Sequence, residues 1–204
     1  MTDHLSVDHY NRNRSIYSPL IEHNGIICGF WLCGNNYQNK TGYYGTYPPS
    51  YMKRIKLLFP NAQKVLHLFS GVVEKGIFEN ETTMDINPEI KPDPENRPAI
   101  IITPDVVGDA AEVSSYFAEN TFDLILADPP YNKNHIRYDT NPVNKRKVVK
   151  QAVTILEPGG YMVWLDTIIP IWAKADGWAL RGTIGLVQST NHATRVITIL
   201  KKKE

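Results

Sequence analysis

Four short apolar segments between residues 64 and 131 each end in a glycine, an acid or both. They read KVLHLFSG, TTMDI, DVVGDA and FDLILADPPY. Helical patterns occur at residues 51–59, 110–120 and 141–156, so strands and helices alternate along this part of the chain. Such alternation predicts an α/β fold with a mostly parallel sheet. Ligands of these sheets bind beyond the carboxyl ends of the strands, so the residues there are the first candidates for a site.

The flanking segments complete the predicted organisation. Residues 1–40 read as an N-terminal extension, polar and loosely docked at first and then forming a strand or hairpin edge at residues 25–34. Residues 41–204 read as one domain. The segment at 87–98 holds four prolines and cannot form a regular helix. Two alternating segments at the end of the chain, LRGTIGLVQS and TRVITILKK, predict a closing antiparallel hairpin.

Charge and cysteine content narrow the possible settings. The 204 residues carry a formal net charge of +1, so any nucleic-acid surface has to be a local patch. No apolar run approaches the roughly 18–20 residues that span a bilayer, and the N-terminus lacks a signal-peptide pattern, which predicts a soluble cytoplasmic protein. The two cysteines, Cys28 and Cys33, lie in an apolar stretch and predict buried thiols rather than a zinc site with nearby histidines. No metal site is expected.

Each strand-end residue also has an ordinary structural explanation. Asp109 could cap the helix that follows it, Asp85 could begin an Asn-Pro turn, and Gly71 could serve only a turn. Two consecutive prolines usually stiffen a loop. Caps and turns do not explain why all four features occur in this order and at these spacings.

In that order, the motifs resemble the class I S-adenosylmethionine-dependent methyltransferases, and specifically the amino-methyltransferases with a [DNS]-P-P-[YFW] motif. The resemblance covers roughly residues 42–200, and the segment GYYGTYPPSYMKRIKLLFP resembles the one that precedes the first strand in DNA amino-methyltransferases. It implies a Rossmann-like fold with a mostly parallel seven-stranded sheet and a C-terminal antiparallel hairpin. It also implies S-adenosylmethionine as the cofactor.

The resemblance assigns catalysis to Asp128, Pro129, Pro130 and Tyr131. An exocyclic amine on adenine is a poor nucleophile because its lone pair is delocalised into the ring. Hydrogen-bond acceptors aimed at its two N–H groups localise that pair and stabilise the developing positive charge. The resemblance gives these acceptors to the Asp128 carboxylate and the Pro129 carbonyl, whose direction is restricted by the fixed φ of proline. Tyr131 offers a flat ring on which the target base can stack.

The resemblance also implies a cofactor site built from the other strand ends. The turn after the first strand would lie under the methionine part, the acid after the second would bind the ribose hydroxyls, and the acid after the third would bind the cofactor adenine. A loop before the first strand would contact the methionine end. The implied cofactor-binding residues are Tyr44, Tyr47, Pro48, His67, Phe69, Ser70, Gly71, Asp85, Ile86, Asp109, Ala110 and Asp128.

Two departures from the family pattern concern this cofactor site. His67 stands where relatives have an acid that helps to hold the cofactor ammonium, and a neutral imidazole supplies no full negative charge. Val73 stands where relatives have a second glycine, and a β-branched residue disfavours positive φ. Between the catalytic motif and the next helix there is no room for a separate recognition domain. The basic segment 132–150 could instead guide phosphates to the site, or it could be a solvated helix face.

Three functions fit these residues. The first is methyl transfer to the N6 amine of adenine in DNA, favoured by Asp rather than Ser before Pro-Pro. The second is methylation of a base amine in RNA, such as guanine N2 or adenine N6. The third is a catalytically silent module that binds nucleic acid or a partner, suggested by His67 and Val73. The expected partners are nucleic acid, DNA before RNA, and a second copy or another protein that supplies target recognition; no membrane partner is expected.

Overall fold

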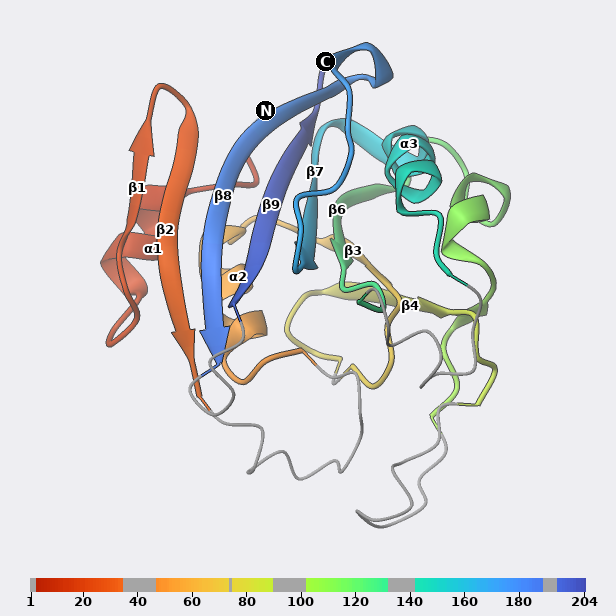
Figure 1. The fold of residues 1–204 in the computed structure, drawn as a ribbon, viewed down its shortest axis with the longest axis horizontal. Coiled ribbons are helices and arrows are strands. Elements are labelled where there is room, and N and C mark those ends of the chain that lie inside the picture. The colour runs from red at the N-terminus through yellow and green to blue at the C-terminus, as the bar shows by residue number, and fades with distance from the viewer. Residues whose placement is uncertain (1–2, 35–46, 74, 90–101, 132–141, 189–193) are drawn as a thin grey trace.

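One mixed sheet of nine strands organises the chain (Figure 1). The computed structural model describes residues 3–34, 47–73, 75–89, 102–131, 142–188 and 194–204. The strand order is β1-β2-β8-β9-β7-β6-β3-β4-β5. The bounds are β1 (Leu20–His23), β2 (Ile26–Cys33), β3 (Lys64–Leu68), β4 (Asn80–Asp85), β5 (Val106–Val107), β6 (Phe122–Ala127), β7 (Leu156–Asp166), β8 (Trp178–Gln188) and β9 (Thr194–Lys202).

Strand directions place several carboxyl ends at one edge of the sheet. β2 to β8 all run in the same direction, whereas β1 and β9 run the opposite way. β9 lies between β7 and β8 and pairs with both in antiparallel fashion, as the C-terminal pattern predicts. The sheet has two strands more than the seven expected, because β1 and β2 add a hairpin that pairs with β8.

The N-terminal segment contributes to the core. Helix α1 (Val7–Asn13) begins at Ser6, whose hydroxyl accepts a hydrogen bond from the His9 N–H at 3.1 Å. The side chains of Val7 and Tyr10 are buried in the same cluster as β2 and β9 residues. The expectation of a loosely docked start is therefore wrong: polar residues dominate the segment, but Val7 and Tyr10 face the sheet. A domain boundary near residue 40 stays a prediction, since residues 35–46 lie outside the described part.

Helices cover both faces of the sheet and enclose two apolar cores (Figure 1). α1 and α2 (Tyr51–Leu58) pack on one face, where α2 buries Ile55 and Leu58 and ends before Pro60, as its pattern predicts. On the other face, α3 (Lys145–Ile155) packs against the 3₁₀ helix η2 (Ala110–Ser115). A second short 3₁₀ helix, η3 (Lys174–Asp176), precedes β8.

The segment after β5 is shorter in its helix than its pattern predicts. The pattern indicates a helix over residues 110–120, but only η2 forms, and Glu112 inside it has non-helical φ and ψ of −116° and 23°. Among the described residues between β3 and β4 there is no helix either. Within the described ranges, no helix combines the length and apolar character needed to cross a bilayer.

Candidate active site

The catalytic motif begins where the most buried strand ends. All six residues of β6 are buried between β3 and β7, so the chain emerges at Asp128 with a fixed position. Asp128 is half-buried, and its Oδ1 accepts a hydrogen bond from the Tyr131 hydroxyl at 2.6 Å. Burial raises the pKa of Asp128 to about 6, although the Tyr131 hydrogen bond and the charge of Arg195 act in the opposite direction. Asp128 is thus ionised at neutral pH, yet titrates close to it.

The corner after Asp128 places an aromatic ring beside the carboxylate. Pro129 is buried, Pro130 is half-buried, and no described peptide bond is cis. Burial and the Asp128 charge raise the pKa of Tyr131 far above its usual range, so its hydroxyl stays protonated and remains a donor. The guanidinium carbon of Arg195, from the start of β9, lies 4.9 Å from the Tyr131 ring centroid. One face of the ring therefore meets a cation.

A second carboxylate stands at the end of the neighbouring strand. Asp166 closes β7, is fully buried, and forms an ion pair with Lys145 at 2.7 Å. It also accepts hydrogen bonds from Trp164 Nε1 at 3.3 Å and from the Thr167 backbone N–H at 2.7 Å. Its charge contributes to the raised pKa of Asp128, which Lys145 opposes. Sequence reasoning missed this group, although the acid at the end of GGYMVWLD was visible.

The turn after β3 has a strained backbone. Phe69 has a φ of 57°, which is rare for a bulky residue, and Gly71 has a φ of 49°. The Ser70 N–H donates to the Met84 carbonyl at 3.1 Å. The Ser70 hydroxyl is buried without a hydrogen-bond partner, so a polar atom at this turn is left unsatisfied. Val73 does not have positive φ, so the predicted conflict between a β-branched residue and that backbone conformation does not arise.

Asp85 closes β4 and fastens the same turn. Its Oδ2 accepts from the Gly71 N–H at 3.0 Å and its Oδ1 from the Asn87 N–H at 3.0 Å. Each carboxylate oxygen has a further lone pair. The next side chain, Ile86, is 49% exposed. An acid and an exposed apolar side chain therefore follow one another at this strand end.

Asp109 acts as the cap that its position suggests. Its Oδ1 accepts from the Ala111 N–H at 2.8 Å, and Ala110 begins η2 as a buried residue. Asp109 itself is exposed, which leaves Oδ2 accessible from solvent. The capping and the cofactor interpretations of Asp109 are compatible, because they use different oxygens.

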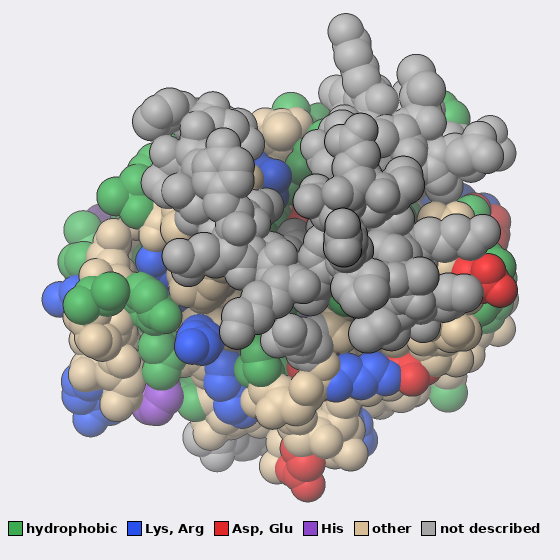
Figure 2. All heavy atoms as spheres, turned by 90° about the horizontal axis from the view of Figure 1, so that it is seen from below, with side chains coloured by type: hydrophobic (Ala, Val, Ile, Leu, Met, Phe, Trp, Pro, Cys, Tyr) green, Lys and Arg blue, Asp and Glu red, His purple; other side chains and the backbone are tan. Residues whose placement is uncertain are grey.

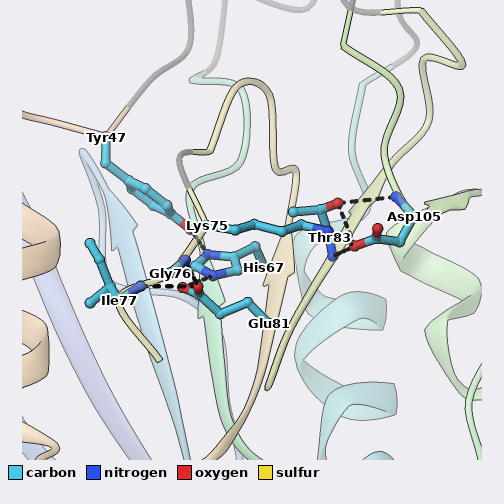
Figure 3. Close-up of polar contacts among 8 residues, drawn as sticks. All are labelled: Tyr47, His67, Lys75, Gly76, Ile77, Glu81, Thr83 and Asp105. Carbon is cyan, nitrogen blue, oxygen red and sulfur yellow. Dashed lines mark hydrogen bonds and ion pairs between the residues drawn. The ribbon is translucent and has the colours of Figure 1, made fainter. Parts of the chain in front are cut away.

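The loop before α2 reaches β3 through one aromatic residue. Tyr47 is half-buried, and its hydroxyl lies 3.4 Å from Nδ1 of the fully buried His67 (Figure 3). Nε2 of His67 lies 3.3 Å from Oε1 of Glu81 on β4. Pro48 is buried next to Tyr47, and Tyr44 lies outside the described residues. His67 is therefore enclosed by Tyr47 and Glu81, and sequence reasoning did not select Glu81.

The carboxyl ends of the parallel strands face the viewer of Figure 2. In the described part of this face, Lys and Arg side chains lie among uncharged and acidic ones rather than in one separate patch. Two lysines of the basic segment are already paired, Lys145 with Asp166 and Lys147 with Glu112. For these two lysines the structure favours internal pairing over the phosphate-guiding role.

Metal ligands do not cluster in the described part of the chain, where no group of three or more His, Cys, Asp or Glu side chains is placed to hold an ion. Cys33 is buried, as predicted, but Cys28 is exposed, which corrects that expectation. The two cysteines fall on opposite faces of β2, and α1 and α2 cover only the Cys33 face.

Comparison with solved structures identifies the architecture. TrmN from Thermus thermophilus superposes with a TM-score of 0.51 at 18% sequence identity, over 82% of this chain and 52% of TrmN. The fold is that of the class I methyltransferases. The methyltransferase fold confirms the predicted fold class in kind, with nine strands in place of seven. The chain spans about half the length of TrmN.

Two further structures with the methyltransferase fold were solved with ligands named in their descriptions. One is the N-methyltransferase NodS from Bradyrhizobium japonicum WM9 with S-adenosyl-L-homocysteine, at 11% identity over 76% of this chain and 85% of NodS, TM-score 0.46. The other, also from Thermus thermophilus and named as a DNA modification methylase, holds S-adenosyl-L-methionine. It is 20% identical over 48% of this chain and 52% of its own, TM-score 0.35. No protein-family model and no curated protein matches the sequence.

Proposed function

We propose that the protein transfers a methyl group from S-adenosylmethionine to an exocyclic amine of a nucleobase, with the N6 amine of adenine in DNA as the target. The observation that carries this proposal is the corner at Asp128. A desolvated carboxylate, a restricted proline carbonyl and an aromatic ring stand together at the end of the central strand of a methyltransferase fold. Asp in the first position of the motif favours adenine.

The residues at the neighbouring strand ends fit the cofactor. The Ser70 hydroxyl is buried and lacks a partner at the turn expected to lie under the methionine part. Asp85 retains lone pairs for the ribose hydroxyls, Ile86 exposes apolar surface for the adenine ring, and Asp109 keeps one oxygen accessible for its amine. S-adenosylmethionine supplies the electrophilic methyl group.

The side chains of this chain would activate the amine. Oδ2 of Asp128 accepts a hydrogen bond from one N–H of the target amine, while Oδ1 is held by Tyr131. The Pro129 carbonyl accepts from the second N–H. Both interactions favour a localised lone pair on nitrogen and stabilise the positive charge that grows there as the bond forms. A carboxylate with a pKa of about 6 can then take up the proton that the methylated amine releases.

The target base has to leave a duplex stack to reach a corner of this kind, so flipped or single-stranded nucleotides are the expected substrates. Nucleoside mass spectrometry after incubation with unmethylated DNA or RNA tests the proposal. N6-methyldeoxyadenosine from the DNA arm is the expected product. A methylated base only in the RNA arm would reassign the substrate. No methylated nucleoside from either arm, together with intact binding of S-adenosylhomocysteine, would support the silent module.

Methyl transfer should depend on pH through Asp128. The carboxylate accepts from the amine only when ionised, so kcat/KM should fall about tenfold per pH unit below a pKa of about 6. Initial rates from about pH 4.5 to about pH 8.5 measure the limb, and binding of S-adenosylhomocysteine over the same range serves as the control. A limb near pH 4 would indicate a solvated carboxylate and contradict the assignment.

Tyr131→Phe should separate the two roles of this ring. Its hydroxyl lowers the pKa of Asp128, so the variant should move the acidic limb of kcat/KM to higher pH and retain most of the plateau rate. Tyr131→Ala should in addition raise KM for the nucleic acid about 5- to 100-fold, because stacking is worth about 1–3 kcal/mol per base. An unchanged KM in Tyr131→Ala would show that the base does not stack there.

A further inference from the structure

His67, Glu81 and Tyr47 form a connected polar chain inside the sheet (Figure 3). β3 and β4 pair in parallel with Val65 opposite Glu81 and His67 opposite Thr83, which places Glu81 diagonally across from His67 on the same face. The His67 and Glu81 side chains are 0% and 2% exposed. Their interaction is thus a buried one, where an unpaired polar group is costly.

Glu81 determines which nitrogen of His67 carries the proton. Burial opposes ionisation of Glu81, but the hydrogen bond from His67 and others from backbone N–H groups lower its pKa overall, so Glu81 is a carboxylate and only accepts. Nε2 of His67 must therefore carry the proton and donate to Oε1. In the neutral ring Nδ1 is then an acceptor, and the Tyr47 hydroxyl has to donate to it. The lone pairs of the Tyr47 oxygen remain available to accept from a ligand.

The chain leaves a net negative charge beside the end of β3. In the described part of the molecule no Lys or Arg is paired with Glu81. The second oxygen of Glu81 instead accepts from the backbone N–H groups of Gly76 and, at 3.2 Å, Ile77. Tyr47 is kept in place by stacking on Tyr51, with ring centroids 5.0 Å apart. Burial and then the Asp128 charge raise the pKa of Tyr47, so its hydroxyl lies within electrostatic reach of the proposed catalytic carboxylate.

We propose that Tyr47, His67 and Glu81 act as a relay that recognises the cationic ammonium group of the cofactor, with Tyr47 as the contacting acceptor and Glu81 as the source of negative charge. The relay rests on the proposed function, since it takes S-adenosylmethionine as the ligand. It explains how β3 can carry a histidine in place of an acid: the carboxylate has moved to the neighbouring strand. His67 and Glu81 are positioning residues, because they act through Tyr47.

Binding of S-adenosylhomocysteine and of its analogue lacking only the amino group, measured by calorimetry, tests the relay. Glu81→Gln should weaken binding of S-adenosylhomocysteine about 10- to 100-fold, the worth of a charged hydrogen bond, and leave the weaker binding of the analogue unchanged. Asp105→Asn is the matched control, because Asp105 also binds β4 through Thr83 and holds Lys75 of the same loop, but does not contact His67. Its affinity should stay within about twofold of wild type.

Tyr47→Phe provides a second variant in case Glu81→Gln folds poorly. It keeps the stack on Tyr51 and removes the accepting oxygen, so it should show the same selective loss. Nitrogen NMR of His67 in the ligand-free protein should show the proton on Nε2, and this pattern should be lost in Glu81→Gln.

The outcomes separate the relay from the proposed function. A proton on Nδ1, or an equal loss for both ligands in Glu81→Gln and Tyr47→Phe, would overturn the relay while wild-type binding keeps the cofactor assignment. Wild-type protein that binds neither ligand would overturn the cofactor assignment and the relay together.

Discussion

Asp128→Asn should lower methyl transfer by at least about 10²–10³-fold, the loss that follows removal of one group that stabilises transition-state charge. The amide is nearly the same shape and its oxygen can still accept from Tyr131, but the negative charge opposite the target amine is gone. Binding of S-adenosylhomocysteine should change little, because the other strand ends carry most of the proposed cofactor contacts. Single-turnover rates and calorimetry measure the two quantities separately.

The same substitution should make the folded protein more stable at about pH 8. The pKa of Asp128 is about 6 in the folded state and 3.8 without the fold, so the folded protein binds this proton more tightly. Stability therefore falls as pH rises from about 4 to 6, and at about pH 8 the ionised group costs about 1–3 kcal/mol. Asparagine removes that cost, which raises Tm by roughly 2–4 °C per kcal/mol. The gain should vanish near pH 4.

Asp123→Asn is the matched control for both measurements. Asp123 is a buried carboxylate on the same strand, at the opposite end, where its Oδ2 accepts from the N–H groups of Gln63 at 2.8 Å and Lys64 at 3.0 Å. It should lose about 1–3 kcal/mol of stability and keep methyl transfer. If Asp128→Asn also loses stability at about pH 8, Asp128 is a structural group, and the catalytic assignment is wrong.

The strand ends could be predicted because they depend on local pattern. The apolar runs before Phe69, Asp85 and Asp128 have the length and composition of buried strands, and Gly and Pro mark where they stop. The closing pair β8 and β9 could be predicted for the same reason. The N-terminal hairpin was only half recognised, because its strands find their partner, β8, about 150 residues later in the chain.

Residues brought to the site by pairing alone could not be predicted. Glu81 lies near the start of β4 and reaches His67 only through the β3–β4 register. Arg195 begins β9, which inserts between β7 and β8 and so comes to lie beside Tyr131. Asp166 is different: its position after an apolar strand was evident, and only the search for known motifs left it unselected.

Lys145→Met should cost about 3–5 kcal/mol of folding free energy, because it leaves the buried carboxylate of Asp166 without its cation. The apolar stem is retained, so little packing is lost, and the expected fall in Tm is about 6–20 °C. The double variant Lys145→Met/Asp166→Asn should recover most of this loss, since it removes the unpaired charge. Thermal and urea unfolding near neutral pH measure all three proteins.

Lys147→Met on the same helix is the comparison that decides the interpretation of Lys145→Met. Lys147 pairs with Glu112, and the two side chains are 41% and 48% exposed, so this substitution should cost only about 0–1 kcal/mol. Lys145→Met should also move the acidic limb of methyl transfer upward, because Lys145 lowers the pKa of Asp128, whereas Lys147→Met should not. Equal stability losses in the two variants would mean that Asp166 is solvated or neutral. Its charge would then no longer help to raise the pKa of Asp128, and burial would have to account for more of that shift.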